Sequence, residues 1–198
     1  MSARTIDASN LPMHAFGASS PIWWGTVLFI AIESMGFALM LATYLYVRGN
    51  FDEWPPSAPF RTGPGALEVG VLLASLVPMA LCWRAVRTER LLATRRWLVL
   101  ATALSMAALA VRAWEIHALP FTWSENAYAS VVWTTVGLHT LEIVVGAAEN
   151  LFLCAVVFRR IMERKAFEDI EASCVFWFFG VLVWLPFAGL FYLDGAIR

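Results

Sequence analysis

Apolar residues dominate five long stretches of the chain, and most charged residues gather between them. A bilayer core about 30 Å thick needs roughly 20 apolar residues in a helix. Short strands of alternating apolarity, which would indicate a membrane barrel, are absent from the sequence. The pattern predicts an all-α membrane protein of one transmembrane domain over residues 1–198, with a polar tail over 1–20. Its bundle of five transmembrane helices is expected over 22–47, 66–84, 97–116, 126–158 and 172–193.

The third helix must include charged residues to reach this length. The uncharged run over 97–111 is too short to span a bilayer, so we expect the helix to continue past Arg112 toward Glu115. Long cationic side chains near a span end can extend along apolar surface and place their charge in the headgroup region. We therefore expect Arg112 to point outward.

Composition excludes several classes of protein. Hydrophobic residues make up 60% of the chain and charged residues 15%, whereas soluble domains average about 45–50% and 25%. The net charge of −1 gives no electrostatic reason to expect a nucleic-acid partner. Three cysteines without a CxxC pair predict neither a disulfide framework nor a redox motif.

The positions of the cations predict an orientation. Ten of the fourteen Lys and Arg residues lie in the N-terminal tail, between the second and third helices, or between the fourth and fifth. Cytoplasmic loops are enriched in Lys and Arg. We expect a multi-pass protein of the bacterial inner membrane with a cytoplasmic N-terminus and an extracytoplasmic C-terminus. Trp54, in a proline-rich loop on the outer side, is expected to lie at the membrane interface.

Polar residues at membrane depth are the candidates for function, because placing them there is costly. Glu33 lies in the middle of the first helix, within the segment FIAIESMGF. Apolar surroundings disfavour a charged carboxylate. Two interpretations stay open, a site that exchanges protons or faces lipid, and a neutral glutamic acid hydrogen-bonded to a neighbouring helix.

The fourth helix carries a longer polar pattern. Thr135, His139, Glu142 and Glu149 follow helical spacing with Gly146 among them, so they share one face that we expect to point into the bundle or a partner. Gly137 and Gly146 are candidate helix-packing positions, and Gly146 with its alanine neighbours would let another backbone approach closely. We favour a simple contact between His139 and Glu142, one turn apart, over a functional role for the pair.

The same residues give little reason to expect a metal. A di-iron bundle site uses Glu-x-x-His turns on two helices, whereas this sequence has one such turn in reversed order, His139 to Glu142. The HExxH and CxxCH signatures are absent. We therefore expect no metal, no catalytic residue and no cofactor bound by this chain.

Four segments together resemble subunit III of the haem–copper terminal oxidases, in a short five-helix form. They cover 23–193 and read WWGTVLFIAIESMGFALMLATYLYVRGN, LLASLVPMALCWRAVR, RAWEIHALPFTWSENAYASVVWTTVGLHTLEIVVG and FWFFGVLVWLPFAGLFYL. The first is similar to the family's helix with a mid-membrane glutamate. The third is similar to its G-x-H-x-x-H-x-x-x-G run, and the last to its final aromatic helix.

The chain departs from this family at three positions. Glu142 stands where the family has the second histidine of the G-x-H-x-x-H run. Alignment on Trp184 places Phe178 and Val181 where the family's final helix has a histidine and an aspartate. The resemblance therefore implies a divergent branch in which this polar cluster is partly lost or rebuilt.

The resemblance also implies a function. Subunit III is an accessory subunit without a redox centre; it flanks catalytic subunit I, accompanies subunit II, and holds phospholipid, while haem and copper lie in the partner subunits. The complex reduces oxygen, takes electrons from cytochrome c or quinol, and pumps protons. In the family, the glutamate matching Glu33 reacts with carbodiimide. The alternatives are an accessory subunit of a nitric oxide reductase, a small transporter, or an embedded enzyme that uses Glu33 and the His139/Glu142 face.

Overall fold

Five long helices make up most of the computed structural model, which describes residues 20–58, 62–159 and 164–193. In chain order they are α1 (Pro21–Arg48), α2 (Thr62–Arg87), α3 (Leu91–His117), α4 (Ala127–Arg159) and α5 (Arg164–Leu193). Each is long and apolar enough to cross a membrane. The prediction of an all-α protein with five transmembrane helices is confirmed, and no strand occurs in the described residues.

The helices extend beyond the predicted spans, mostly at their starts. α2 begins four residues before the expected position 66, and α5 begins eight residues before position 172. Polar turns can continue a helix outside the apolar core, so hydropathy marks the membrane segment and not the whole helix. The polar tail expected over residues 1–20 lies, apart from Ser20, outside the described residues.

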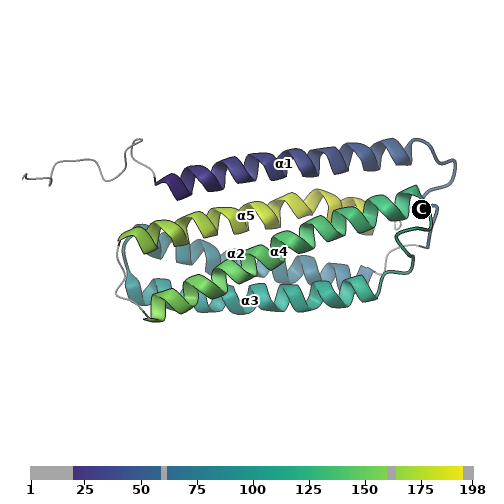
Figure 1. Cartoon of the computed structure of the whole chain (residues 1–198). Helices are drawn as coiled ribbons and strands as arrows, with labels where there is room; N and C mark the ends of the chain where they lie inside the picture. The colour runs from purple at the N-terminus through teal and green to yellow at the C-terminus, as the bar shows by residue number, and fades with distance from the viewer. Residues whose placement is uncertain (1–19, 59–61, 160–163, 194–198) are drawn as a thin grey trace, which may run out of the picture.

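Four of the helices form a ring, and the fifth lies beside it. α2 packs on α3, α3 on α4, α4 on α5, and α5 again on α2. α1 packs only on α4 and α5, and Figure 1 shows it running along one side of the molecule. Only 6% of the most apolar 18-residue window of α1 is buried, against 33% to 44% for the other helices.

Successive helices run in opposite directions, so their connections alternate between the two ends (Figure 1). The first helix begins at a regular cap, since the hydroxyl of Ser20 accepts a hydrogen bond from Trp23 N at 3.2 Å and Pro21 occupies the first helical position. The α1–α2 and α3–α4 connections meet at one end, where the Ser57 hydroxyl donates to Glu125 and accepts from Asn126.

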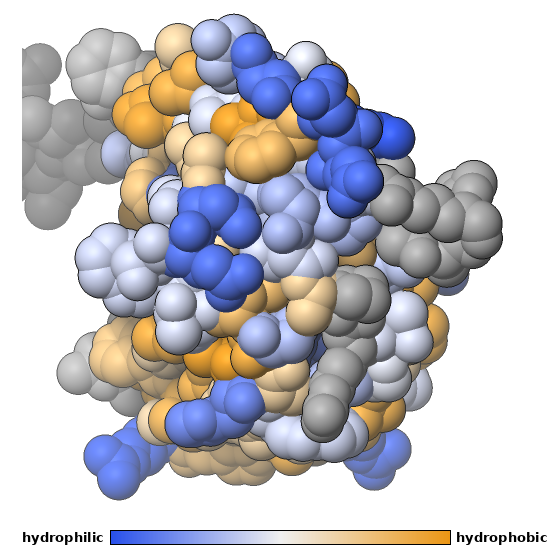
Figure 2. Space-filling model, turned by 90° about the vertical axis from the view of Figure 1, so that its right-hand side faces the viewer, coloured by the Kyte–Doolittle hydropathy of each residue, from blue (hydrophilic) through white to orange (hydrophobic). Residues whose placement is uncertain are grey.

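Trp54, which the sequence predicts at the membrane interface, is buried within the protein at this end of the bundle. It is 8% exposed, and its ring lies edge-on to Tyr44 and Tyr128 with centroids 5.4 and 4.9 Å away. Aromatic pairs in this geometry add to the gain from burial. Figure 2 looks onto the same end and shows separate hydrophilic patches among apolar residues.

Candidate functional site

The centre of the four-helix ring holds a charged cluster around Arg112 of α3. Arg112 is 0% exposed, so the expectation that it points outward is wrong. Its Nη1 donates to Glu115 Oε2 at 2.7 Å, and its Nη2 lies 3.5 Å from Glu68 Oε1 of α2. The arginine lies inside because these partners offset the cost of removing its charge from water.

His139 of α4 connects this arginine to the last helix. Arg112 Nη2 lies 2.8 Å from His139 Nδ1, and His139 Nε2 lies 3.1 Å from the carbonyl oxygen of Gly180 on α5. Because a guanidinium can only donate, Nδ1 accepts and Nε2 carries the proton that it donates to Gly180. The imidazole also stacks on Trp184 at 4.3 Å, with an angle of 4° between the rings.

Two aromatic residues of α5 complete the cluster. The guanidinium of Arg112 lies over Trp184 at 4.3 Å from the ring centroid, which is a cation–π contact. The hydroxyl of Tyr192 donates to the second oxygen of Glu115. Arg112 therefore contacts α2, α4 and α5 from its place on α3, and it ties all four helices of the ring together.

A glycine leaves room for this arrangement at the start of α2. A Cβ at Gly65 would collide with the ring of Tyr192, which indicates that the close approach of α2 to α5 requires glycine there.

Both oxygens of Glu68 are buried without a hydrogen-bond partner among the described residues. Glu68 is therefore held near the cluster by charge and packing alone.

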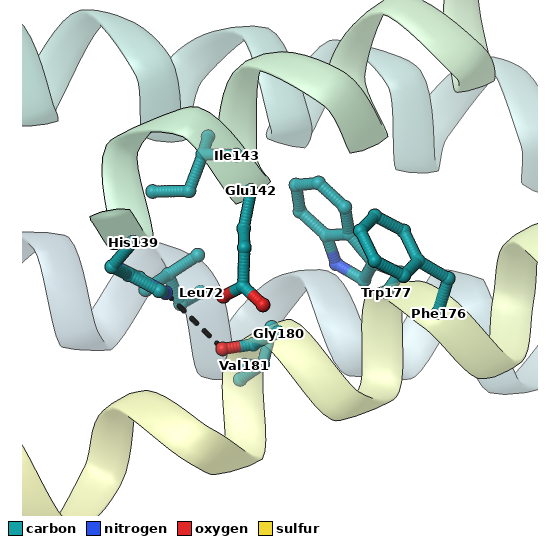
Figure 3. Close-up of a pocket in the computed structure, with 8 residues that line it drawn as sticks. All are labelled: Leu72, His139, Glu142, Ile143, Phe176, Trp177, Gly180 and Val181. Carbon is teal, nitrogen blue, oxygen red and sulfur yellow. Dashed lines mark hydrogen bonds between the residues drawn. The ribbon is translucent and has the colours of Figure 1, made fainter. Parts of the chain in front are cut away.

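A second polar position, Glu142, lies one turn along α4 from His139 and points into a small pocket between α4, α5 and α2 (Figure 3). Its side chain is 5% exposed, and neither oxygen has a hydrogen-bond partner in the described part of the chain. Oε2 lies 3.8 Å from the position that a Cβ would take at Gly180. The free volume of about 10 Å³ is close to the least that holds one water.

The expected contact between His139 and Glu142 does not occur. His139 uses both ring nitrogens on Arg112 and Gly180, whereas the carboxyl of Glu142 points toward α5. Helical spacing places the two residues on one face, but the partners on neighbouring helices decide the hydrogen bonds. Two of the three positions at which the sequence resemblance indicates a departure from the family, Glu142 and Val181, line this pocket.

The two glycines of α4 have different surroundings. A Cβ at Gly146 would lie 2.8 Å from the Trp177 ring, so Gly146 admits an indole and not the helix backbone expected from the sequence. Gly137 is exposed and meets open space, which means that it packs against no other helix within the described chain. Its predicted packing role is therefore not found there.

The remaining predicted residues lie apart from the arginine cluster. Thr135 is buried and donates to Val131 O within its own helix. Glu149 is half-buried and lines a groove of about 330 Å³ with residues of α1 and α5. Glu33 is half-buried on α1.

Sequence reasoning missed Glu68, Tyr192 and the inward position of Arg112. The signal available was the placement of three charged residues, Glu68, Arg112 and Glu115, within or next to predicted spans. Such residues almost always face a bundle interior and pair there. The described residues contain no group of three or more His, Cys, Asp or Glu side chains spaced to hold a metal ion.

The fold and the cluster together define a polytopic α-helical membrane protein that pairs an arginine with two carboxylates inside a four-helix ring. Residues 5–195 match the family described as cytochrome c oxidase subunit III. The chain belongs to this family, and the resemblance found in the sequence is confirmed. The same family match supports the prediction that the chain is an accessory subunit III of a haem–copper oxidase.

Individual relatives agree with the family match. A protein of Synechocystis named cytochrome c oxidase subunit 3 is 26% identical over 177 residues, 86% of this chain and 74% of the relative. A Mycobacterium leprae protein named probable cytochrome c oxidase subunit 3 is 25% identical over 187 residues, 91% of each chain. The sea urchin Strongylocentrotus purpuratus has a cytochrome c oxidase subunit 3 that is 31% identical over 72% of this chain, and the match spans 56% of the relative's length.

Proposed function

We propose that the chain acts as the non-redox accessory subunit of a haem–copper oxidase, packed against catalytic subunit I beside subunit II and holding phospholipid. The observation that carries the proposal is the family match over residues 5–195. The charged cluster supports a structural role, because Arg112, His139 and Glu115 form hydrogen bonds that join helices within the bundle. We propose that a single transmembrane domain serves this role.

The outer helix supports association with another protein or with lipid. On α1, Ile32, Met35 and Leu39 are each more than 60% exposed, and the helix is the least buried of the five. A helix that presents large apolar residues outward within a membrane contacts lipid or a second protein. The catalytic subunit is the partner that we propose for this protein.

Copurification tests the proposed partnership. The chain, affinity-tagged and extracted in mild detergent from its native membrane, is expected to bring haem-containing subunits with it. A reduced-minus-oxidised absorption spectrum and native electrophoresis would detect them. An unrelated multi-span protein with the same tag is the control. A monodisperse, haem-free chain with its own turnover would contradict the proposal.

A variant of the proposed proton or lipid site, Glu33, separates accessory from catalytic action. Glu33→Gln keeps the shape of the side chain and removes the titratable proton. In the assembled complex we expect normal assembly, no labelling by a hydrophobic carbodiimide, and at most slower oxygen reduction, because the proposed redox centres lie in other chains. Complete loss of oxygen reduction in a fully assembled complex would show that this chain takes part in catalysis.

We also propose that the end carrying the α2–α3 connection faces the cytoplasm of a bacterial cell. Arg84, Arg87, Arg90, Arg95 and Arg96 gather there, which is the bias that cytoplasmic loops show. Ala58→Cys and Thr88→Cys place exposed thiols at opposite ends. An impermeant thiol reagent added to intact cells should label the first variant only, above the background of the native chain. Labelling of Thr88→Cys alone would reverse the orientation.

A further inference from the structure

The face of α4 that contacts α1 carries Glu142. Contacts on either side of this residue define the face. Leu138 Cδ2 lies 4.0 Å from the position that a Cβ would take at Gly36 of α1. Val145 and Glu149 line a groove together with the beginning of α1. Glu142 follows Leu138 by four residues and precedes Val145 by three, so the three residues share this face.

The matching face of α1 carries Glu33 at the same depth. Phe29, which lines that groove, Glu33 and Gly36 are four and three residues apart and share one face. From the contact between Gly36 and Leu138, Glu142 lies about 6 Å along α4. Glu33 lies about 4.5 Å along α1 from the same contact. Because α1 and α4 run in opposite directions, both distances lead toward the same end of the bundle (Figure 1).

Contacts with α5 place the two glutamates at one depth independently. The rings of Phe29 and Phe176 lie 5.7 Å apart between their centroids. α1 and α5 run in the same direction, and four residues farther along each helix are Glu33 and Gly180. Oε2 of Glu142 lies 3.8 Å from the position that a Cβ would take at Gly180. Glu33 and Glu142 therefore meet at the level of Gly180, where α1, α4 and α5 come together.

The carboxyl of Glu142 needs a ligand that the described residues do not supply. It is 5% exposed, has no hydrogen-bond partner among them, and points into the small pocket of Figure 3. An isolated buried carboxylate is costly. The recorded hydrogen bonds of Arg112 and His139 go to each other, to Glu115 and to α5, and none reaches Glu142. The residues of α2 and α5 that line the pocket carry no ionisable side chain.

We propose that Glu33 and Glu142 bind one proton between them, so that the protonated carboxyl of one donates a hydrogen bond to the ionised carboxyl of the other. Packed helices lie about 8–10 Å apart, a distance that two glutamate side chains at one depth can span. Two carboxyls that share an apolar site cannot both ionise freely, because their like charges repel. The shared proton gives α1 a polar contact with the ring. The pair requires only helices of this chain and does not depend on the proposed oxidase partner.

An infrared titration of the purified protein, in whatever assembly it is obtained, tests the pair. Glutamate is labelled with carbon-13, and the C=O band of the protonated carboxyls is followed across the pH range in which the protein stays folded. Subtracting the spectra of Glu33→Gln/Glu142→Gln isolates the two carboxyls. We expect the native pair to titrate in two steps more than about one pH unit apart. Each single glutamine variant should titrate in one step, and Glu142→Leu provides a second variant at that position.

The matched control is Glu149→Gln, which removes an acid from α4 about 10 Å from Glu142 along the helix. It should leave both steps unchanged. A native curve equal to the sum of the two single-variant curves would overturn the proposal, because the carboxyls would then titrate independently. A shift of the steps when sodium replaces choline in the buffer would overturn it as well, since the ligand would then be a metal cation. Loss of haem partners with both steps retained would instead count against the oxidase proposal alone.

Discussion

Arg112→Met is expected to destabilise this protein more than any surface substitution on the chain. The change keeps an apolar side chain of similar length but leaves Glu115 and Glu68 inside the bundle without their cation. Removing one partner of a buried ion pair costs about 3–5 kcal/mol. For a chain of this size that corresponds to a fall of roughly 6–20 °C in the unfolding temperature.

Thermal unfolding in one detergent, followed by tryptophan fluorescence or by loss of the subunit from its complex, measures this effect. Arg84→Met is the matched control, since Arg84 is exposed, and its unfolding temperature should stay near that of the native chain. Arg112→Lys should fall between the two, because an ammonium keeps the charge but cannot reach the carboxylate and the imidazole in the same planar geometry. A change below about 1 kcal/mol for Arg112→Met would show that the cluster does not hold the ring together.

The effect of Arg112→Met is expected to depend on the two carboxylates that it leaves unpaired, Glu68 and Glu115. Replacing a whole buried ionic group by apolar residues is often neutral or stabilising. The combined variant Glu68→Leu/Arg112→Met/Glu115→Leu should therefore regain part of the stability lost in Arg112→Met. Such a recovery would identify unpaired carboxylates, and not a lost packing contact, as the origin of the loss.

The fold could be predicted from the sequence because the property that defines it is local. Stretches of about 20 apolar residues specify a membrane helix through their own composition, whatever they pack against. The continuation of α3 beyond residue 111 followed from the same length requirement. The starts of α2 and α5 could not be located from the sequence, since hydropathy does not distinguish a polar helical turn outside the apolar core from a loop.

The candidate site was predicted only in outline. Helical spacing placed His139 and Glu142 on one face of α4, but the partners of His139 come from α3 and α5, and Glu142 has no hydrogen-bond partner among the described residues. Arg112 shows why this information is missing from the spacing. An arginine near a span end can extend outward to water or inward to carboxylates, and the choice depends on Glu68, 44 positions earlier on another helix.

The pocket of Glu142 joins two departures from the family that lie far apart in the sequence. The sequence resemblance implies a histidine at position 142 and an aspartate at position 181 in the family's pattern, whereas this chain has Glu142 and Val181, which line the same pocket. The chain thus keeps one carboxyl there but carries it on α4 instead of α5. The carboxyl of Glu142 has no hydrogen-bond partner among the described residues. The other position of the pair carries Val181, which offers it no polar group.

A double-mutant cycle between these positions should show strong coupling. Val181→Asp alone places a second carboxyl beside Glu142 in a site 2% exposed, so it should be destabilising through burial and like-charge repulsion. Glu142→His/Val181→Asp restores a basic and an acidic group side by side. We expect the double variant to unfold at a higher temperature than Val181→Asp, with a coupling of about 1–3 kcal/mol.

Unfolding temperatures of the native chain, both single variants and the double variant, measured in one detergent, give the coupling directly. Val181→Asn is the matched control, because it has the shape of the aspartate without its charge. Paired with Glu142→His, it should couple more weakly than Val181→Asp, since a neutral amide forms no ion pair with the imidazole. Additive effects within about 0.5 kcal/mol in the aspartate cycle would mean that positions 142 and 181 do not interact. The pocket would then explain neither departure from the family.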